Sequence, residues 1–123
     1  MSITVVLADD SDEVRTMLRM ALEMDGRFEV VGEAANGEEA VGAVKDLQPD
    51  AIFLDLVMPE VGGLEAIPRI RDESPDTKIV VLSVAANHPS SADARQLGAT
   101  AVIQKGGVQS ADEMAAEVAG LFA

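Results

Sequence analysis

The sequence contains no cysteine, no tryptophan and no tyrosine, so phenylalanine supplies its only aromatic rings. Without cysteine the chain can form no disulfide and can offer no thiolate to a metal, which fits a reducing compartment. No apolar run approaches the roughly 20 residues that a membrane-spanning helix needs. The first residues lack the basic start of a secretory signal, and Asp9 and Asp10 follow a short apolar run. We therefore expect a cytoplasmic protein with no membrane segment.

Positive charge is also scarce in this sequence. Lysine and arginine total 9 against 22 aspartate and glutamate residues, which gives a formal net charge of −13. A surface of this sign repels the phosphates of nucleic acids and of anionic lipids. The composition therefore predicts neither direct nucleic-acid binding nor membrane binding by this chain. An excess of carboxylates can instead hold a divalent cation, provided that several of them converge.

What the sequence does contain is the material of one globular domain. Its 123 residues are 48% hydrophobic and 25% charged, which is ordinary for a folded chain. A chain of this length buries roughly two-thirds of the surface that its unfolded form exposes, enough for one hydrophobic core. No internal repeat and no low-complexity linker interrupts the sequence. We expect residues 1–123 to form a single domain, with no output domain in this chain.

Short apolar runs alternate with helical patterns along the whole sequence. Several runs are apolar throughout, which is typical of parallel strands covered on both faces. The strands are predicted at 3–8, 28–32, 51–54, 78–82 and 100–103. The helices are predicted at 12–24, 38–47, 64–70, 90–97 and from 110 onward. This alternation predicts an α/β fold of the (βα)5 type, with a doubly wound five-stranded parallel sheet in the order 2-1-3-4-5 between two helical layers.

Two of the predicted helices carry an apolar stripe at helical spacing. The stripe of the first helix consists of Val14, Met17, Leu18, Ala21 and Leu22. The stripe of the last helix consists of Met114, Val118, Leu121 and Phe122. We expect both stripes to face the core, and we interpret the methionines other than Met1 as core residues.

Polar residues follow four of the five predicted strands, at the point where each strand ends. Asp9 and Asp10 follow the first strand, and Asp55 follows the third. Ser83 follows the fourth strand, and Lys105 comes soon after the fifth. In a sheet of the predicted order the carboxyl ends of the strands lie along one edge, where such folds bind ligands. We therefore expect three carboxylates, one hydroxyl and one ammonium group to meet there.

This set of groups permits a narrow range of chemistry. Crowded carboxylates repel one another, so a cation among them lowers the cost of ionising all of them. Oxygen ligands without cysteine favour a hard cation, Mg²⁺ or Mn²⁺. Lys105 and Ser83 suit phosphoryl oxygens, and a carboxylate such as Asp55 can itself accept a phosphoryl group. Taken singly, Asp9 and Asp10 are also explained as helix-capping residues and Asp55 as a turn residue; their joint occurrence favours a site.

The motifs at these strand ends resemble the receiver domain of two-component response regulators. The resemblance covers essentially the whole chain and implies a flavodoxin-like fold. The motifs are VVLADDS at 5–11, LDLVMP at 54–59, VVLS at 80–83 and GATAVIQK at 98–105. The segment VVGEAANGEEA at 30–40 resembles the branch whose receivers precede a LuxR-type helix-turn-helix.

The resemblance implies a role for each carboxylate. A sensor histidine kinase would phosphorylate Asp55 in a Mg²⁺-dependent reaction. Asp10, Asp55 and the backbone carbonyl of Val57 would ligate Mg²⁺, and Asp9 would act through water. The phosphoryl group, once transferred, would carry roughly two negative charges.

The resemblance also implies a conformational switch. Lys105 would pair with the phosphoryl group, and Ser83 would move to bond it. The face made by the fourth helix, the fifth strand and the fifth helix would then change and regulate an output, with transcription suggested by the LuxR branch. The partners implied are the kinase, an output domain or effector protein, and a second copy of the chain upon phosphorylation. Val102 is a departure, because the family often has an aromatic residue there whose ring moves with the hydroxyl.

Two other functions fit part of this pattern. A Mg²⁺-dependent phosphohydrolase would use the same edge, but such enzymes usually carry a second aspartate two residues after the nucleophile, where this sequence has Val57. We therefore expect no enzyme beyond catalysis of the chain's own phosphorylation and dephosphorylation. A stand-alone or phosphorylation-independent protein-binding module is the remaining alternative, and the departure at Val102 keeps it open.

Overall fold

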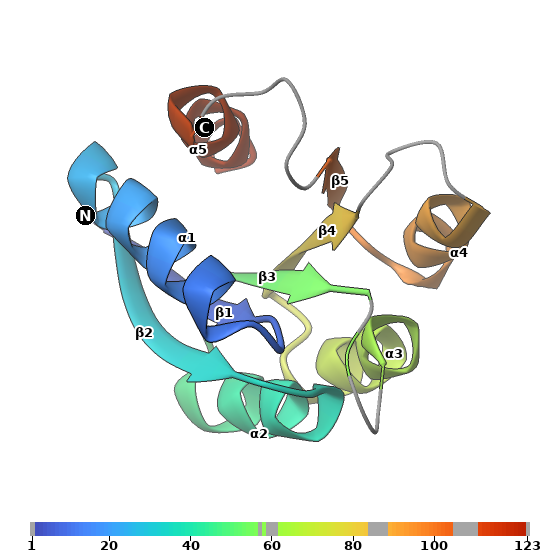
Figure 1. The fold of residues 1–123 in the computed structure, drawn as a ribbon. Helices are drawn as coiled ribbons and strands as arrows, with labels where there is room; N and C mark the ends of the chain where they lie inside the picture. The colour runs from blue at the N-terminus through green and yellow to red at the C-terminus, as the bar shows by residue number, and fades with distance from the viewer. Residues whose placement is uncertain (1, 57, 59–61, 84–88, 105–110, 123) are drawn as a thin grey trace.

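The structure is a computed structural model that describes residues 2–56, 58, 62–83, 89–104 and 111–122. Within these ranges strands and helices alternate strictly (Figure 1). The strands are β1 (Ile3–Ala8), β2 (Phe28–Ala34), β3 (Ala51–Asp55), β4 (Lys78–Ser83) and β5 (Ala101–Gln104). The helices are α1 (Asp12–Asp25), α2 (Gly37–Leu47), α3 (Gly63–Glu73), α4 (Pro89–Leu97) and α5 (Ala111–Gly120).

The strands form one parallel sheet in the order β2-β1-β3-β4-β5, which confirms the predicted topology. Helices α1 and α5 cover one face of the sheet, and α2, α3 and α4 cover the other (Figure 1). The side chains of a strand point alternately to its two faces, so Val5 and Leu7 pack under α1 and α5 while Val6 and Ala8 pack under α2 and α3. Burial on both faces is the reason that β1, β3 and β4 contain continuous apolar runs.

The predicted elements are all present, and their compared ends agree within two residues except that α3 runs to Glu73, three residues beyond the predicted end. Strand β2 runs to Ala34 and β3 includes Asp55, each beyond the predicted end. The predicted start of the last helix, residue 110, lies outside the described residues. Helix α3 continues through Pro68, which is exposed, so its missing N–H lies on the solvent side of the helix.

The predicted burial of the methionines is wrong for helix α1. Met17, Met20 and Met24 are 60%, 58% and 84% exposed. Helix α1 contacts the sheet mainly through Leu18 and Leu22, which are buried, so the face it buries is narrower than the apolar stripe of the sequence. Met58 and Met114, by contrast, are buried as predicted. In the last helix Met114 and Val118 are buried as predicted, whereas Leu121 and Phe122 follow the end of α5 and pack, partly buried, against the same core.

A polar network closes the amino-terminal edge of the sheet. Gln48, at the end of α2, has the positive φ of 46° that belongs to the left-handed region. Its amide nitrogen donates to the carbonyls of Val44 (3.0 Å) and Glu73 (2.9 Å), and its amide oxygen accepts from the hydroxyl of Ser74 (3.2 Å). The ends of α2 and α3 are thereby joined, and terminal carbonyls of both helices gain a hydrogen-bond donor.

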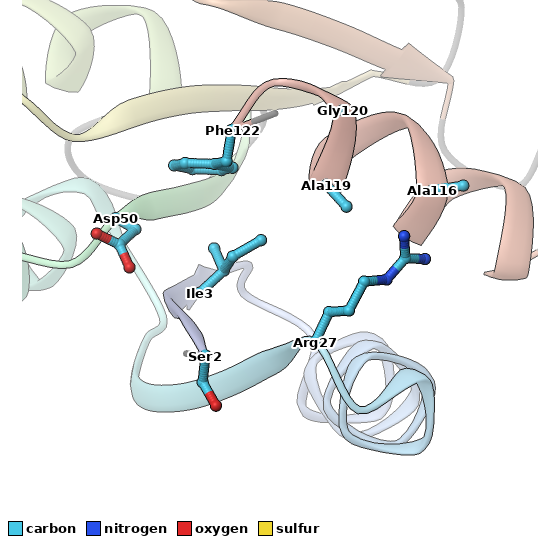
Figure 2. A pocket seen from close by; sticks show the side chains of 8 residues that line it. All are labelled: Ser2, Ile3, Arg27, Asp50, Ala116, Ala119, Gly120 and Phe122. Carbon is cyan, nitrogen blue, oxygen red and sulfur yellow. The ribbon is translucent and has the colours of Figure 1, made fainter.

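A cavity of about 590 Å³ lies at the same edge, between the start of β1 and helix α5 (Figure 2). Its walls are mostly apolar, with Ile3 and Phe122 among them. The two charged groups there have partners, since Arg27 pairs with Asp25 (2.6 Å) and Asp50 accepts from the backbone N–H of Thr4 (2.9 Å). This cavity is at the opposite end of β1 from Asp9 and is separate from the site described below.

Among the described residues no helix has both the length and the apolar character needed to cross a bilayer.

Candidate functional site

The structure brings Asp9, Asp10 and Asp55 together at the carboxyl edge of the sheet. Strands β1 and β3 are hydrogen-bonded neighbours, with Ala8 in register with Leu54, so the residues that follow these two positions are adjacent. One carboxylate oxygen from each aspartate lies within 4.8 Å of the other two. Asp9 and Asp55 are buried, at 0% and 5% exposure, whereas Asp10 is exposed. The acidic cluster is therefore open to solvent on the side of Asp10.

Hydrogen bonds fix the loop that carries two of these carboxylates. The backbone N–H of Asp9 donates to the carbonyl of Ala34 (3.0 Å), and its carboxylate accepts from the N–H of Ser11 (2.9 Å). Ser11 is the N-cap of α1, because its hydroxyl accepts from the N–H of Val14. The capping role considered for Asp9 and Asp10 thus belongs to Ser11, and the loop presents the two aspartates at the sheet edge.

Arg15 is a member of this environment that the sequence analysis did not identify. Its guanidinium bonds the backbone carbonyl of Asp9 and the carboxylates of Asp12 and Glu33. Arg19 also pairs with Glu33, at 2.6 Å. Hydrogen bonds from Arg19 and Arg15 hold the pKa of Glu33 below its ordinary value, against the opposing effect of burial. One signal was available, since arginines four residues apart share a helix face.

Gly63 is a second residue that the sequence analysis passed over. It begins α3, and its N–H donates to the carbonyl of Leu56 (3.1 Å), which closes the segment that follows β3. A Cβ atom at this position would lie 2.3 Å from the carbonyl oxygen of Asp55. Only glycine allows the backbone of α3 to approach the backbone of Asp55 so closely. The pair of glycines at 62–63 was the signal in the sequence.

The remaining predicted site residues lie partly beyond the described residues. Strand β4 ends at Ser83, whose backbone is in register with Gln104; its side chain is not described. Val57 and Lys105 lie outside the described residues. Val102 is buried at 9% exposure, is in register with Val81 and packs in the same cluster as Ala94 of α4. The register therefore brings the end of β4 to the same edge as Asp55, which is in register with Leu82.

The acidic cluster fits a hard divalent cation. All of its donors are carboxylate oxygens from two adjacent strand ends, and such oxygens are the ligands that Mg²⁺ prefers. Magnesium keeps several waters and takes one or two carboxylates, which suits a cluster with one solvent-exposed member. Asp9, Asp10 and Asp55 can therefore hold a metal ion.

Comparison with known proteins decides the family. Residues 5–118 match the response regulator receiver domain. The chain belongs to this family. The response regulator GacA of Pseudomonas viridiflava is 39% identical over 105 residues, which are 85% of this chain and 49% of that protein. The crystal structure of a LuxR-family two-component response regulator from Aurantimonas has a TM-score of 0.89 at 26% identity, and covers 98% of this chain and 85% of that one. The resemblance to this branch is thereby confirmed.

The receiver domain also occurs in a relative of another kind. The protein-glutamate methylesterase/protein-glutamine glutaminase 3 of Paramagnetospirillum magneticum is 43% identical over 112 residues, which are 91% of this chain but 31% of that protein. The chain thus spans about half or less of these curated relatives. What it shares with them is a receiver domain of two-component signalling, a domain that is generally regulatory.

Proposed function

We propose that this receiver domain is a phosphorylation-controlled switch in which Asp55 accepts a phosphoryl group from a sensor histidine kinase. The observation that carries the proposal is the convergence of Asp55 with Asp9 and Asp10 within 4.8 Å at the carboxyl edge of the sheet. Asp55 ends a buried strand and is 5% exposed, so it is largely shielded from bulk water. Family membership supports the same role.

In this proposal Asp10, Asp55 and the backbone carbonyl of Val57 hold Mg²⁺, and Asp9 contributes through a water molecule. Bound Mg²⁺ supplies positive charge that offsets the repulsion between the carboxylates and an incoming phosphoryl group. The exposure of Asp10 leaves room on its side for water and for phosphoryl oxygens. Asp9 is fully buried and accepts a backbone N–H bond from Ser11, which suits an indirect role.

The phosphoryl transfer itself needs little from the protein beyond position. A carboxylate oxygen of Asp55 forms a bond to phosphorus while the bond from phosphorus to the kinase histidine nitrogen breaks. The electron pair of the broken bond leaves with the histidine, and no oxidant or reductant takes part. Lys105 then pairs with the phosphoryl oxygens and Ser83 donates to one of them. The chain so described regulates other proteins and acts as a catalyst only on its own phosphorylation state.

The output face in this proposal is formed by α4, β5 and α5. Strand β5 is the edge strand next to β4, and the two helices lie on opposite faces of the sheet (Figure 1). Val102 in β5 is packed against the cluster that includes Ala94 of α4. Because Val102 is a buried aliphatic residue, movement of Ser83 is transmitted here through packing and not through rotation of an aromatic ring. The regulated partner is an output domain or effector protein, transcription is the process, and phosphorylation favours pairing of two copies. We assign this chain, residues 1–123, to one cytoplasmic receiver unit.

The test is the intact mass of the protein after incubation with acetyl phosphate or phosphoramidate, with and without Mg²⁺. Mass is the direct readout, because the chain has no tryptophan or tyrosine to report by fluorescence. We expect one phosphoryl adduct that requires Mg²⁺ and disappears in Asp55→Asn. The matched control, Asp46→Asn, changes an exposed aspartate of α2 and should keep the adduct. An adduct that persists in Asp55→Asn overturns the assignment; no adduct with any donor favours the phosphorylation-independent binding module instead.

A further inference from the structure

One arginine, Arg15, holds the loop between β1 and α1 by hydrogen bonds. The Arg15 side chain is 13% exposed, and its guanidinium reaches three different segments of the chain. It donates to the backbone carbonyl of Asp9 in the loop, to the carboxylate of Asp12 in the first turn of α1, and to Glu33 of β2, at 2.9 Å from its Nε. A guanidinium is planar and directs its five N–H groups at fixed angles, so three simultaneous partners restrict all three segments.

The bond to the Asp9 carbonyl also fixes the residue that follows. The peptide group between Asp9 and Asp10 is planar, so that holding the carbonyl oxygen holds the N–H of Asp10 in the same plane. Two further hydrogen bonds of Asp9 join its N–H to Ala34 and its carboxylate to Ser11. Arg15 therefore helps to orient the peptide plane that leads into Asp10, whose carboxylate is exposed.

We propose that Arg15 is a positioning residue for the cation site, and that Glu33 holds Arg15 in place for this role. The proposal rests on the Mg²⁺ site of the proposed function but concerns a residue outside the set of ligands. Groups that orient metal ligands influence metal affinity although they do not touch the metal. Arg15 does so through the backbone of the ligand loop, and Glu33 does so through Arg15.

Charge alone predicts the opposite effect from positioning. Arg15 places a positive charge beside a loop that contributes two carboxylates to the cluster. Removing that charge makes the cluster more negative, which by itself strengthens the binding of a cation. Removing the hydrogen bond to the Asp9 carbonyl leaves the loop less constrained, which weakens the binding of the cation. The sign of the change in affinity thus separates the two effects.

Arg19 provides a matched control within the same ion-pair group. It pairs with the same carboxylate, Glu33, at 2.6 Å, but its other partner is Glu23 on the outer side of α1. Among the described residues, no hydrogen bond or ion pair joins Arg19 to the loop of Asp9. Arg19→Ala therefore removes one positive charge, two hydrogen bonds to Glu33 and one to Glu23, while the bond from Arg15 to the Asp9 carbonyl remains.

The experiment is a titration with Mn²⁺, followed by electron paramagnetic resonance, of the wild-type chain and of Arg15→Ala, Arg15→Lys and Arg19→Ala. Circular dichroism in EDTA first establishes that each variant is folded at the temperature of the titration. We expect Arg15→Ala to bind Mn²⁺ about tenfold more weakly, as is typical when a group behind a metal ligand is removed. Arg15→Lys keeps the charge but not the planar fork, so it should recover only part of the loss. Arg19→Ala should bind as tightly as the wild type or slightly more tightly.

The outcomes distinguish this inference from the proposed function. Equal affinity of Arg15→Ala and Arg19→Ala overturns the positioning role while the cation site stands, and tighter binding by Arg15→Ala shows that charge is the dominant effect and also overturns it. Wild-type Mn²⁺ affinity in Arg15→Lys also overturns the positioning role, because lysine keeps the charge without the planar guanidinium. If Arg15→Ala is unfolded, the Mn²⁺ affinities of Arg15→Lys and Arg19→Lys are compared instead. Weaker binding by Arg15→Lys supports the positioning role, and equal binding overturns it. If the wild type binds no Mn²⁺, or if Asp10→Asn leaves binding unchanged, the metal site of the proposed function fails and this inference fails with it.

Discussion

At the scale of single residues, Gly63 shows how closely the fold approaches the proposed phosphoacceptor. The first residue of α3 lies so near Asp55 that an added Cβ would meet its carbonyl oxygen at 2.3 Å. The atoms that an added Cβ would meet belong to the backbone of Asp55 and Leu56, so the clash cannot be relieved by rotating a side chain. Any residue larger than glycine must move α3 away from the end of β3, which carries Asp55.

We expect Gly63→Ala to lower the free energy of unfolding by about 1–3 kcal/mol, the usual cost of forcing extra atoms into a packed site. Gly42 is the control, because it is exposed in the middle of α2 and an added Cβ there meets nothing within 4 Å. Gly42→Ala should instead stabilise the protein by about 0.5–1 kcal/mol, since alanine is the better helix former. Urea unfolding followed by circular dichroism measures both changes. If Gly63→Ala had the same free energy of unfolding as the wild type, the two backbones would be further apart in solution.

The same residues show what could and could not be predicted from the sequence. The positions of Asp9, Asp10 and Asp55 follow from strand ends, because a regular sheet converts sequence position into location along one edge. Arg15 could not be placed in this way, because its role depends on where a long side chain reaches across to β2 and back to the loop. The requirement for glycine at position 63 likewise depends on the distance between the backbones of α3 and Asp55, which the periodicity of the sequence does not give. The end of a strand can be predicted from one sequence, whereas the reach of a long side chain and the approach of two backbone segments cannot.

At the scale of elements, helix α1 marks the limit of reading burial from apolar spacing. Its apolar residues extend over a wider arc than the sheet covers. Of the residues of α1, the structure buries only Leu18 and Leu22, while Met17, Met20 and Met24 remain exposed. A helix that lies across a sheet contacts it along one line, so residues at the side of the stripe reach solvent. The order of the strands was easier to predict, because alternation and crossover handedness leave few arrangements.

This division of α1 predicts unequal effects of two neighbouring substitutions. Leu22→Ala should destabilise the protein by about 2–5 kcal/mol, because Leu22 is fully buried under the sheet and its loss leaves a cavity. Met24→Gln should change stability by less than about 0.5 kcal/mol, because Met24 is 84% exposed. Chemical unfolding of the two variants beside the wild type provides the measurement. A large loss in Met24→Gln would show that this residue is covered in solution, by another copy or by a part of the chain outside the described residues.

At the scale of the whole molecule, the dominant electrostatic fact is the net charge of −13. Such a charge opposes the compact state, since carboxylates repel one another across the surface and most strongly where Asp9, Asp10 and Asp55 converge. The cluster therefore has two energetic states. Without a cation it is a source of repulsion within the folded protein, and with a cation the same carboxylates become favourable ligands.

This dual character yields opposite effects of Asp10→Asn with and without Mg²⁺. In EDTA the variant should melt at or above the wild-type temperature, because one charge of the cluster is removed and Asp10 is exposed enough to leave no buried group unpaired. In the wild type, Mg²⁺ at 100 times its dissociation constant should add about 2.7 kcal/mol to the free energy of unfolding. Asp10→Asn should lose most of that gain, while the control Asp46→Asn, in which an exposed aspartate of α2 is changed, should keep it.

Thermal melting by circular dichroism at constant ionic strength measures these shifts, with NaCl replacing MgCl₂ so that general screening is the same in both series. If NaCl raised the melting temperature as much as MgCl₂ does, the stabilisation would come from screening of the whole surface and not from the cluster. If Asp10→Asn were less stable than the wild type in EDTA, its carboxylate would have a structural partner in the folded state, and the repulsion argument would fail at that position. The predicted pattern, a variant that is at least as stable as the wild type without Mg²⁺ and less stable with it, requires that the carboxylates converge and that a cation binds among them.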